Sequence, residues 1–126
     1  MDNISLNASE WKIMEYLWSS SPQTLMQIVR EMKETIGWSK STVTTLLSRM
    51  EHKGAIYYKE GARAREYYPA VTREAAAMEE TRSLLSRVYR GSIGMMMNTL
   101  VEENSLTKED IDELYEILKK AEEKND

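Results

Sequence analysis

Residues 39 to 54, SKSTVTTLLSRMEHKG, gather hydroxyl groups and positive charges on one side of a predicted helix. Its other side is apolar at helical spacing and is predicted to face a core. A merely solvated side would carry more Glu and Lys, which are better helix formers. Short hydroxyl side chains let a helix approach nucleic acid closely and donate hydrogen bonds to phosphates and base edges. The predicted contacts on this helix are Ser39, Lys40, Ser41, Thr42, Thr44, Thr45, Arg49 and Lys53.

The elements that must position this segment come before it. Asn7, with Glu10 three residues later, has the spacing of a reciprocal helix cap. Thr24 is the next predicted cap, and Ser39 the third. Gly37 and Gly54 supply the helix stops that follow the second and third helices. The short turn GWS between these two helices is typical of a helix-turn-helix.

After Gly54 the sequence changes its period. AIYYK (55–59) and REYYPAV (65–71) are rich in aromatic and β-branched residues, and EGARA separates them. This pattern predicts a β-hairpin with Arg63 and Arg65 at its tip. We interpret the four tyrosines as cross-strand packing, with base stacking as the alternative. Three helices followed by a hairpin predict a winged helix-turn-helix over residues 1–71, whose third helix enters the major groove of double-stranded DNA.

Residues 72–126 are predicted to be helical throughout, with interruptions at Gly91-Ser92 and Asn104-Ser105. These helices are too short to bury their apolar residues alone, and pairing with a second copy is the simplest remedy. Met95-Met96-Met97 fits such a dimer core better than a soft-metal site, since no Cys or His is near. The predicted dimerisation residues are Leu84, Leu85, Val88, Ile93, Met96, Leu100, Leu114 and Leu118.

Charge is distributed unevenly along the chain. The net charge is −4, yet residues 40–65 hold six Lys or Arg against two Asp or Glu. A basic surface in an acidic chain favours a nucleic-acid partner.

The chain has no cysteine and a single histidine, His52, so the sequence predicts no metal site, no cofactor and no enzyme. We also expect no membrane insertion and a cytoplasmic location, because no long apolar run or signal-peptide pattern is present.

Four stretches resemble the penicillinase-repressor type of winged-helix repressor, the BlaI/MecI/CopY family, from about Ile4 to Leu118. They are ISLNASEWKIMEYLW, GWSKSTVTTLLSRMEHKG, YYKEGARAREYYPAV and GSIGMMMNTLVEENSLTKEDIDELYEIL. The resemblance implies a homodimeric repressor with an N-terminal winged helix and a C-terminal helical dimerisation domain. It implies binding to a dyad operator that controls β-lactamase or other stress and resistance genes. The copper-responsive branch ends in Cys-x-Cys ligands, which this chain lacks.

In the antibiotic-responsive branch, a membrane sensor-transducer protease system triggers cleavage in the dimerisation domain after an asparagine. The matching pair here is Asn98-Thr99, with Thr99 in place of the phenylalanine of the family. The resemblance therefore implies derepression by proteolysis within residues 95–104. The alternative function is a helical adaptor that binds another protein through residues 72–126, with a winged helix not used for DNA.

Overall fold

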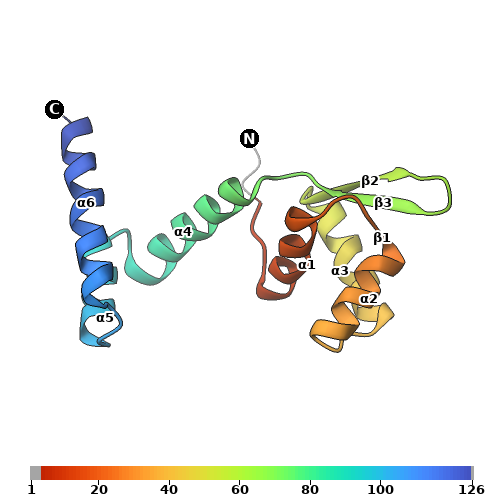
Figure 1. Cartoon of the computed structure of the whole chain (residues 1–126), viewed down its shortest axis with the longest axis horizontal. Helices are drawn as coiled ribbons and strands as arrows, with labels where there is room; N and C mark the ends of the chain where they lie inside the picture. Colours follow the sequence, from red (N-terminus) through yellow and green to blue (C-terminus); the bar gives the residue numbers. More distant parts are fainter. Residues whose placement is uncertain (1–3, 126) are drawn as a thin grey trace. The chain divides into compact units, whose positions relative to one another are not determined.

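The computed structural model describes residues 4–125, and its elements form two compact units, Met1–Arg82 and Ser83–Asp126 (Figure 1). Both the winged helix-turn-helix and the mainly helical fold class predicted from the sequence are confirmed. Within the described residues, no helix has the length and apolar character needed to span a bilayer. The elements in chain order are α1 (Ala8–Ser19), β1 (Gln23–Thr24), α2 (Leu25–Thr35), α3 (Lys40–His52), β2 (Ile56–Glu60), β3 (Arg65–Pro69), α4 (Arg73–Tyr89), α5 (Ile93–Glu102) and α6 (Lys108–Lys124).

The predicted helix caps are confirmed. The Asn7 side chain accepts a hydrogen bond from the Glu10 backbone N–H, and the Glu10 carboxylate accepts one from the Asn7 N–H, both at 2.9 Å. Thr24 forms the same reciprocal box at the start of α2, and Ser39 caps α3 through the Thr42 N–H. These bonds satisfy backbone donors that have no partner within the helix, so each helix begins where its cap stands.

The sheet has three antiparallel strands in the order β1-β3-β2. The sequence predicts the hairpin of β2 and β3 but not β1, which contributes only two residues. Gln23 of β1 pairs with Tyr67 of β3 and is buried. Its side-chain amide accepts from the Tyr16 hydroxyl at 3.0 Å and donates to the Ser20 carbonyl at 2.9 Å. This short strand attaches the start of α2 to the wing.

A single apolar core fills the N-terminal unit. The predicted inner face of α3 is buried, and α1 and α2 contribute apolar residues from the sides that face it. Trp11 and Trp18 lie half-buried at the edge of this core. The buried members are Leu6, Ile13, Met14, Leu17, Ile28, Val29, Met32, Val43, Leu46, Leu47, Met50, Ala55, Ile56, Tyr67 and Ala76.

One carboxylate is buried within this unit. The side chain of Glu10 is 1% exposed, and one of its oxygens lies 2.8 Å from the ammonium of Lys53, which caps the end of α3. The same ammonium donates to the Ser5 carbonyl at 2.9 Å. Lys53 therefore joins the N-terminal end of α1 to the C-terminal end of α3. Lys53 is one of the predicted DNA contacts; its ammonium already has Glu10 as a partner, and its contact with DNA stays a prediction.

The C-terminal unit is organised differently. Arg90 and Gly91 adopt left-handed backbone angles, φ 51° and 85°, and separate α4 from α5. Asn104, at φ 58°, follows α5, and Thr107 caps α6 through a reciprocal box with Asp110. None of the described residues from 83 to 125 is buried in the single chain. The unit therefore has no core of its own.

Replacing Lys53 by Ala should lower the free energy of unfolding by about 1–3 kcal/mol, because it leaves the buried Glu10 carboxylate without its cation. Lys12→Ala, an exposed change on α1, is the matched control and should stay within about 0.5 kcal/mol of the parent. Urea unfolding followed by tryptophan fluorescence measures both. Equal stabilities of the two variants would show that the pair is dispensable.

Candidate nucleic-acid interface

The outward side of α3 is almost entirely hydroxyl and cationic. Ser41, Thr42, Thr44, Thr45 and Arg49 are all exposed. Because Val43, Leu46, Leu47 and Met50 are buried beneath them, the helix cannot rotate without exposing its core face. The N-terminal end of α3 adds the partial positive charge of its unpaired N–H groups, which favours a phosphate there.

The hydroxyls of this face differ in the hydrogen bonds that they make within the protein. Thr44 donates to the Lys40 carbonyl at 2.8 Å, and Ser39 and Thr42 share a hydrogen bond of 3.1 Å. Within residues 4–125, no protein hydrogen bond of the Ser41 or Thr45 hydroxyl is found. These two are available to a ligand without breaking an internal bond, and the Thr45 methyl can also contact a thymine.

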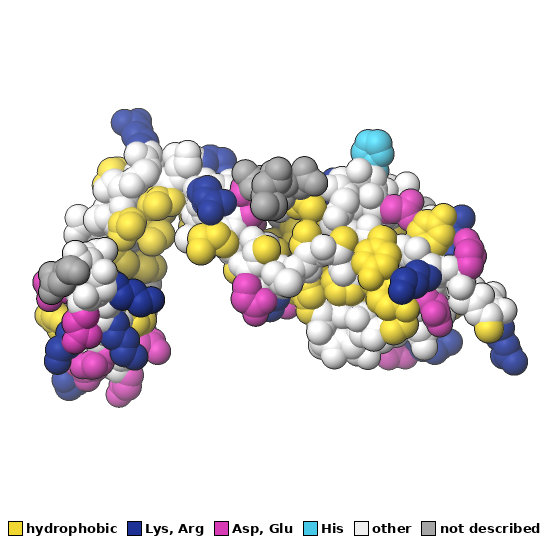
Figure 2. Space-filling view, turned by 90° about the horizontal axis from the view of Figure 1, so that it is seen from above, with side chains coloured by type: hydrophobic (Ala, Val, Ile, Leu, Met, Phe, Trp, Pro, Cys, Tyr) yellow, Lys and Arg dark blue, Asp and Glu magenta, His cyan; other side chains and the backbone are white. Residues whose placement is uncertain are grey.

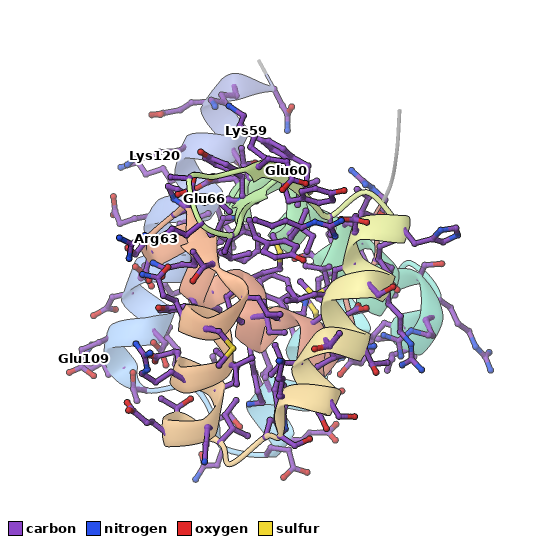
Figure 3. The ribbon with its side chains drawn as sticks, turned by 90° about the vertical axis from the view of Figure 1, so that its right-hand side faces the viewer. Lys59, Glu60, Arg63, Glu66, Glu109 and Lys120 are labelled. Carbon is purple, nitrogen blue, oxygen red and sulfur yellow. The ribbon has the colours of Figure 1, made fainter. Side chains whose placement is uncertain are left out.

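Arg63 lies in the turn between β2 and β3, as predicted, and Figure 3 shows it among Lys59, Glu60 and Glu66 around the tip of the wing. The turn is closed by the Gly61 N–H, which donates to the Ala64 carbonyl at 2.9 Å. A Cβ on Gly61 would come within 2.6 Å of that oxygen, so the turn requires glycine. No ion pair of Arg63 occurs among the described residues.

Arg65 has different surroundings although only one residue separates it from Arg63. It is the first residue of β3, its Nε lies 3.5 Å from a Glu60 carboxylate oxygen, and its guanidinium sits 4.1 Å from the centre of the Tyr58 ring. The electrostatic interaction with Tyr58 is the largest of the effects that raise the pKa of Arg65. These contacts hold the Arg65 side chain against the wing itself.

A groove of about 410 Å³ lies between α3 and the wing residues Ala64, Arg65 and Tyr67. Ser48 and Glu51, which are not among the contacts predicted from the sequence, lie on its α3 side. Ser48 could have been predicted from the sequence, because it follows Thr44 by four residues and so lies on the same face of the helix. The lining consists of Leu25, Thr44, Leu47, Ser48, Glu51, Ala64, Arg65 and Tyr67.

The tyrosines of the wing pack against one another, as predicted. Tyr57 and Tyr68 stack with ring centres 5.2 Å apart, and Tyr58 and Tyr67 lie 5.9 Å apart on the other face. Lys59 lies 5.0 Å from the Tyr68 ring centre. These pairs stiffen a two-stranded ribbon that has little other support beyond β1.

A helix-turn-helix with an exposed hydroxyl face, followed by a basic hairpin, defines the class of winged-helix DNA-binding proteins.

Comparisons with known proteins support this class. The chain is 30% identical to the penicillinase repressor of Bacillus licheniformis over 90% of this chain and 88% of the relative. It is 28% identical to the methicillin resistance regulatory protein MecI of Mammaliicoccus sciuri, over 95% and 99% respectively. The solution structure of the DNA-binding domain of the repressor BlaI matches with a TM-score of 0.54 and 26% identity, over 60% of this chain and 93% of that domain.

The penicillinase repressor model matches residues 6–120. The chain belongs to the penicillinase repressor family and is a DNA-binding transcriptional repressor. This membership favours the repressor over the adaptor interpretation.

Arg63→Ala should weaken binding to all DNA sequences and flatten the dependence of log affinity on log salt by about 0.9 per lost phosphate contact. It should leave the melting temperature unchanged, because the side chain makes no ion pair within the described residues. Arg65→Ala should lower both affinity and melting temperature, since it also removes the contacts with Glu60 and Tyr58. Gel shifts at several salt concentrations measure the affinity and the salt slope of each variant. Arg87→Ala is the charge-matched control on α4. Wild-type affinity and salt slope in Arg63→Ala would contradict the assignment of the wing.

Proposed function

We propose that the chain is a homodimeric repressor whose two winged helices bind the two half-sites of a dyad operator, which controls β-lactamase or other resistance genes. In this proposal, residues 1–71 bind DNA and residues 72–126 dimerise, in the cytoplasm. The single observation that carries the proposal is the contrast between the two units. The N-terminal unit has a complete core, whereas the C-terminal unit buries none of its described side chains.

The apolar surface of the C-terminal unit supports a second copy as its partner. Tyr115 is 70% exposed, Leu118 62% and Ile93 61%, and Figure 2 shows hydrophobic side chains open to solvent on these helices. Monomers rarely expose apolar patches of this kind. A two-fold pairing would cover the same patch on both copies at once. Of the predicted residues, Leu84, Val88, Ile93, Leu100 and Leu118 are exposed and Leu85, Met96 and Leu114 are half-buried in the single chain.

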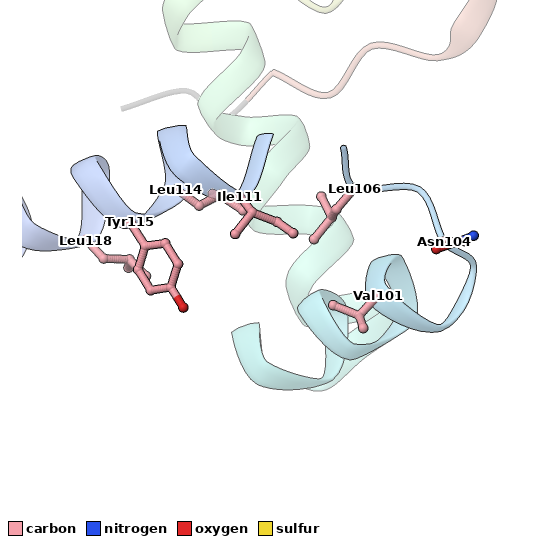
Figure 4. A pocket seen from close by; sticks show the side chains of 7 residues that line it. All are labelled: Val101, Asn104, Leu106, Ile111, Leu114, Tyr115 and Leu118. Atoms are coloured by element: carbon pink, nitrogen blue, oxygen red, sulfur yellow. The ribbon is translucent and has the colours of Figure 1, made fainter. Parts of the chain in front are cut away.

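A pocket of about 370 Å³ opens onto this surface between α5, the following loop and α6 (Figure 4). Val101, Ile111 and Tyr115, which are absent from the predicted dimerisation set, line it together with two residues of that set, Leu114 and Leu118. The nearly uniform apolar lining suits side chains of a second copy. Leu106 and Asn104 complete the pocket at the loop.

On DNA, α3 is proposed to lie in the major groove with its N-terminal end leading, while the wing contacts the backbone. Glu51 lies on the groove side of α3 and would repel phosphates, so it favours an orientation that keeps the backbone near Arg49 and Arg63. Lys53 keeps its place in the set, although its ammonium already pairs with Glu10. The proposed contacts are Ser39, Lys40, Ser41, Thr42, Thr44, Thr45, Arg49, Lys53, Arg63 and Arg65.

Release from DNA is proposed to follow cleavage within residues 95–104 by a membrane sensor-transducer protease system. Asn98 and Thr99 are exposed but lie inside α5, and the Thr99 hydroxyl donates to the Met95 carbonyl at 3.1 Å. Asn98-Thr99 is therefore helical in the intact chain, and α5 must unwind before the backbone can extend into a protease. Cleavage there would separate α6, with Leu114 and Leu118, from the rest of the surface.

Leu118→Asp should convert the dimer to a monomer at micromolar concentration, because it places an unpaired charge in the apolar interface. The winged helix should keep its melting transition, since Leu118 lies in the other compact unit. Lys120→Asp, on the polar side of α6, introduces the same side chain with a larger change in charge and should remain dimeric. Sedimentation equilibrium distinguishes them. If Leu118→Asp sediments like the wild-type dimer, α6 does not form the interface.

A chain truncated after Asn98 should bind an operator with two half-sites about 10²–10⁴-fold more weakly than the full chain, since the second binding event is no longer intramolecular. Its affinity for a single half-site should be unchanged. Fluorescence anisotropy on the two duplexes measures both affinities. A truncated chain that holds the complete operator as tightly as the full chain would refute control through dimer disruption.

A further inference from the structure

Arg65 lies on the face of the wing that borders the groove beside α3. Side chains alternate along each strand, and residues directly opposite one another share a face. The register places Tyr58 opposite Tyr67. It also places Glu60 opposite Arg65, so the four side chains lie on one face. Tyr67 is buried and lines the groove together with Arg65, which identifies this face as the one next to α3.

The ring of Tyr58 supports the guanidinium of Arg65. The central carbon of the guanidinium lies 4.1 Å from the ring centre. A planar guanidinium stacks on an aromatic ring and is attracted by its negative face. The Tyr58 ring is itself held, because it lies 5.9 Å from the ring of the buried Tyr67 and packs against the core. Arg65 is therefore connected to the core of its unit through Tyr58.

Glu60 contributes less to the position of Arg65. Its carboxylate oxygen lies 3.5 Å from Nε of Arg65, and the two side chains are 73% and 52% exposed. Charge-assisted N–H···O bonds are about 2.7–2.9 Å long, and exposed ion pairs contribute little. Tyr58 is therefore the main support of the guanidinium, and Glu60 leaves most of its hydrogen-bonding capacity to a ligand.

Arg63 lacks this support. It is exposed in the turn between β2 and β3, and within residues 4–125 it has neither an ion pair nor an aromatic ring beneath it. Such a side chain loses rotamer freedom when it binds a phosphate, and this loss lowers affinity. Arg65 is already restricted in the free protein, so it binds a phosphate with a smaller loss.

The groove beside Arg65 has the lining that a DNA strand requires at one end. Thr44 and Ser48 are exposed on its α3 side, and the Ser48 hydroxyl has no hydrogen bond within the described residues. In the proposed binding mode, α3 lies in the major groove and the wing on the neighbouring backbone, so a strand passes between them. Glu51 lines the same groove and repels phosphates, which favours a phosphate near Ser48 and Arg65.

We propose that Tyr58 positions Arg65 as a pre-oriented fork that binds one backbone phosphate in this groove, whereas Arg63 acts as a flexible point charge. This inference rests on the proposed contact of the wing with DNA and not on the homodimer. A pre-oriented guanidinium donates two parallel hydrogen bonds to one phosphate. Lysine carries the same charge without the fork or the stacking, so it cannot replace arginine at this position.

The first part of the test compares Arg65→Lys with Arg63→Lys, both in the full-length protein. The probe is a duplex with one half-site, selected by the wild-type protein from random sequences, so that pairing of two copies on DNA does not enter. Arg65→Lys should bind roughly tenfold more weakly with an unchanged salt slope, because it loses a hydrogen bond but no charge. Arg63→Lys should bind within about twofold of wild type. Fluorescence anisotropy at several salt concentrations measures both.

The second part tests the positioning role of Tyr58. Tyr58→Leu removes the aromatic face and keeps an apolar side chain, so it should weaken binding about as much as Arg65→Lys does. The same change should have no further effect in the Arg65→Ala background, because a residue that acts through Arg65 is not additive with its loss. Tyr57→Leu is the matched control: it removes the other stacked pair of the wing, with Tyr68, on the opposite face, and should keep wild-type affinity. Melting temperatures check folding.

Wild-type affinity in Arg65→Lys would overturn the inference and leave the wing contact intact. So would a loss from Tyr58→Leu that is equally large in the Arg65→Ala background. If Tyr58→Leu fails to fold, the exposed Arg65→Lys change decides alone. If neither Arg63→Ala nor Arg65→Ala weakens binding to the half-site, the proposed contact of the wing with DNA fails, and the inference with it.

Discussion

The C-terminal helices carry apolar surface that one chain cannot bury, and the organisation of the whole molecule follows from this constraint. Residues 83–125 contain no buried side chain, although Ile93, Val101, Ile111, Tyr115 and Leu118 are all large and apolar. Hydrophobic burial is the dominant favourable term in folding and association, so this surface favours a partner. In the proposed homodimer, a second copy would cover this surface symmetrically and place two DNA-binding units on one particle.

The N-terminal unit buries its apolar residues within itself. Its core is closed, and Glu10, the buried carboxylate found among residues 4–82, both caps α1 and pairs with Lys53 at the end of α3. That pair ties the first helix to the third, so the hydroxyl side of α3 is presented from a rigid base. Arg49 and Arg63 are exposed on this unit, and we propose that both contact DNA.

Much of this architecture could be predicted from local signals. The caps at Asn7, Thr24, Ser39 and Thr107 act over three residues, and apolar spacing placed the buried face of α3 correctly. The strand β1 could not be predicted, because two residues carry no periodicity and are ordered by pairing with β3.

The surroundings of two predicted DNA contacts could not be predicted, for a common reason. Lys53 pairs with Glu10, which lies 43 residues away, where no spacing rule applies. Arg65 was grouped with Arg63, yet the register of the hairpin places it opposite Glu60 and beside Tyr58. Sequence patterns identify faces of helices, whereas pairings between distant charges require the fold.

The central claim is that two copies act together on one operator. Titration of the wild-type protein against a duplex with two half-sites, and against the same duplex with one half-site scrambled, tests it most directly. We expect two chains per intact operator and an affinity about 10²–10⁴-fold above that for the scrambled duplex, which reflects the effective concentration of the second winged helix. Equal affinities, with one chain bound to each duplex, would contradict it.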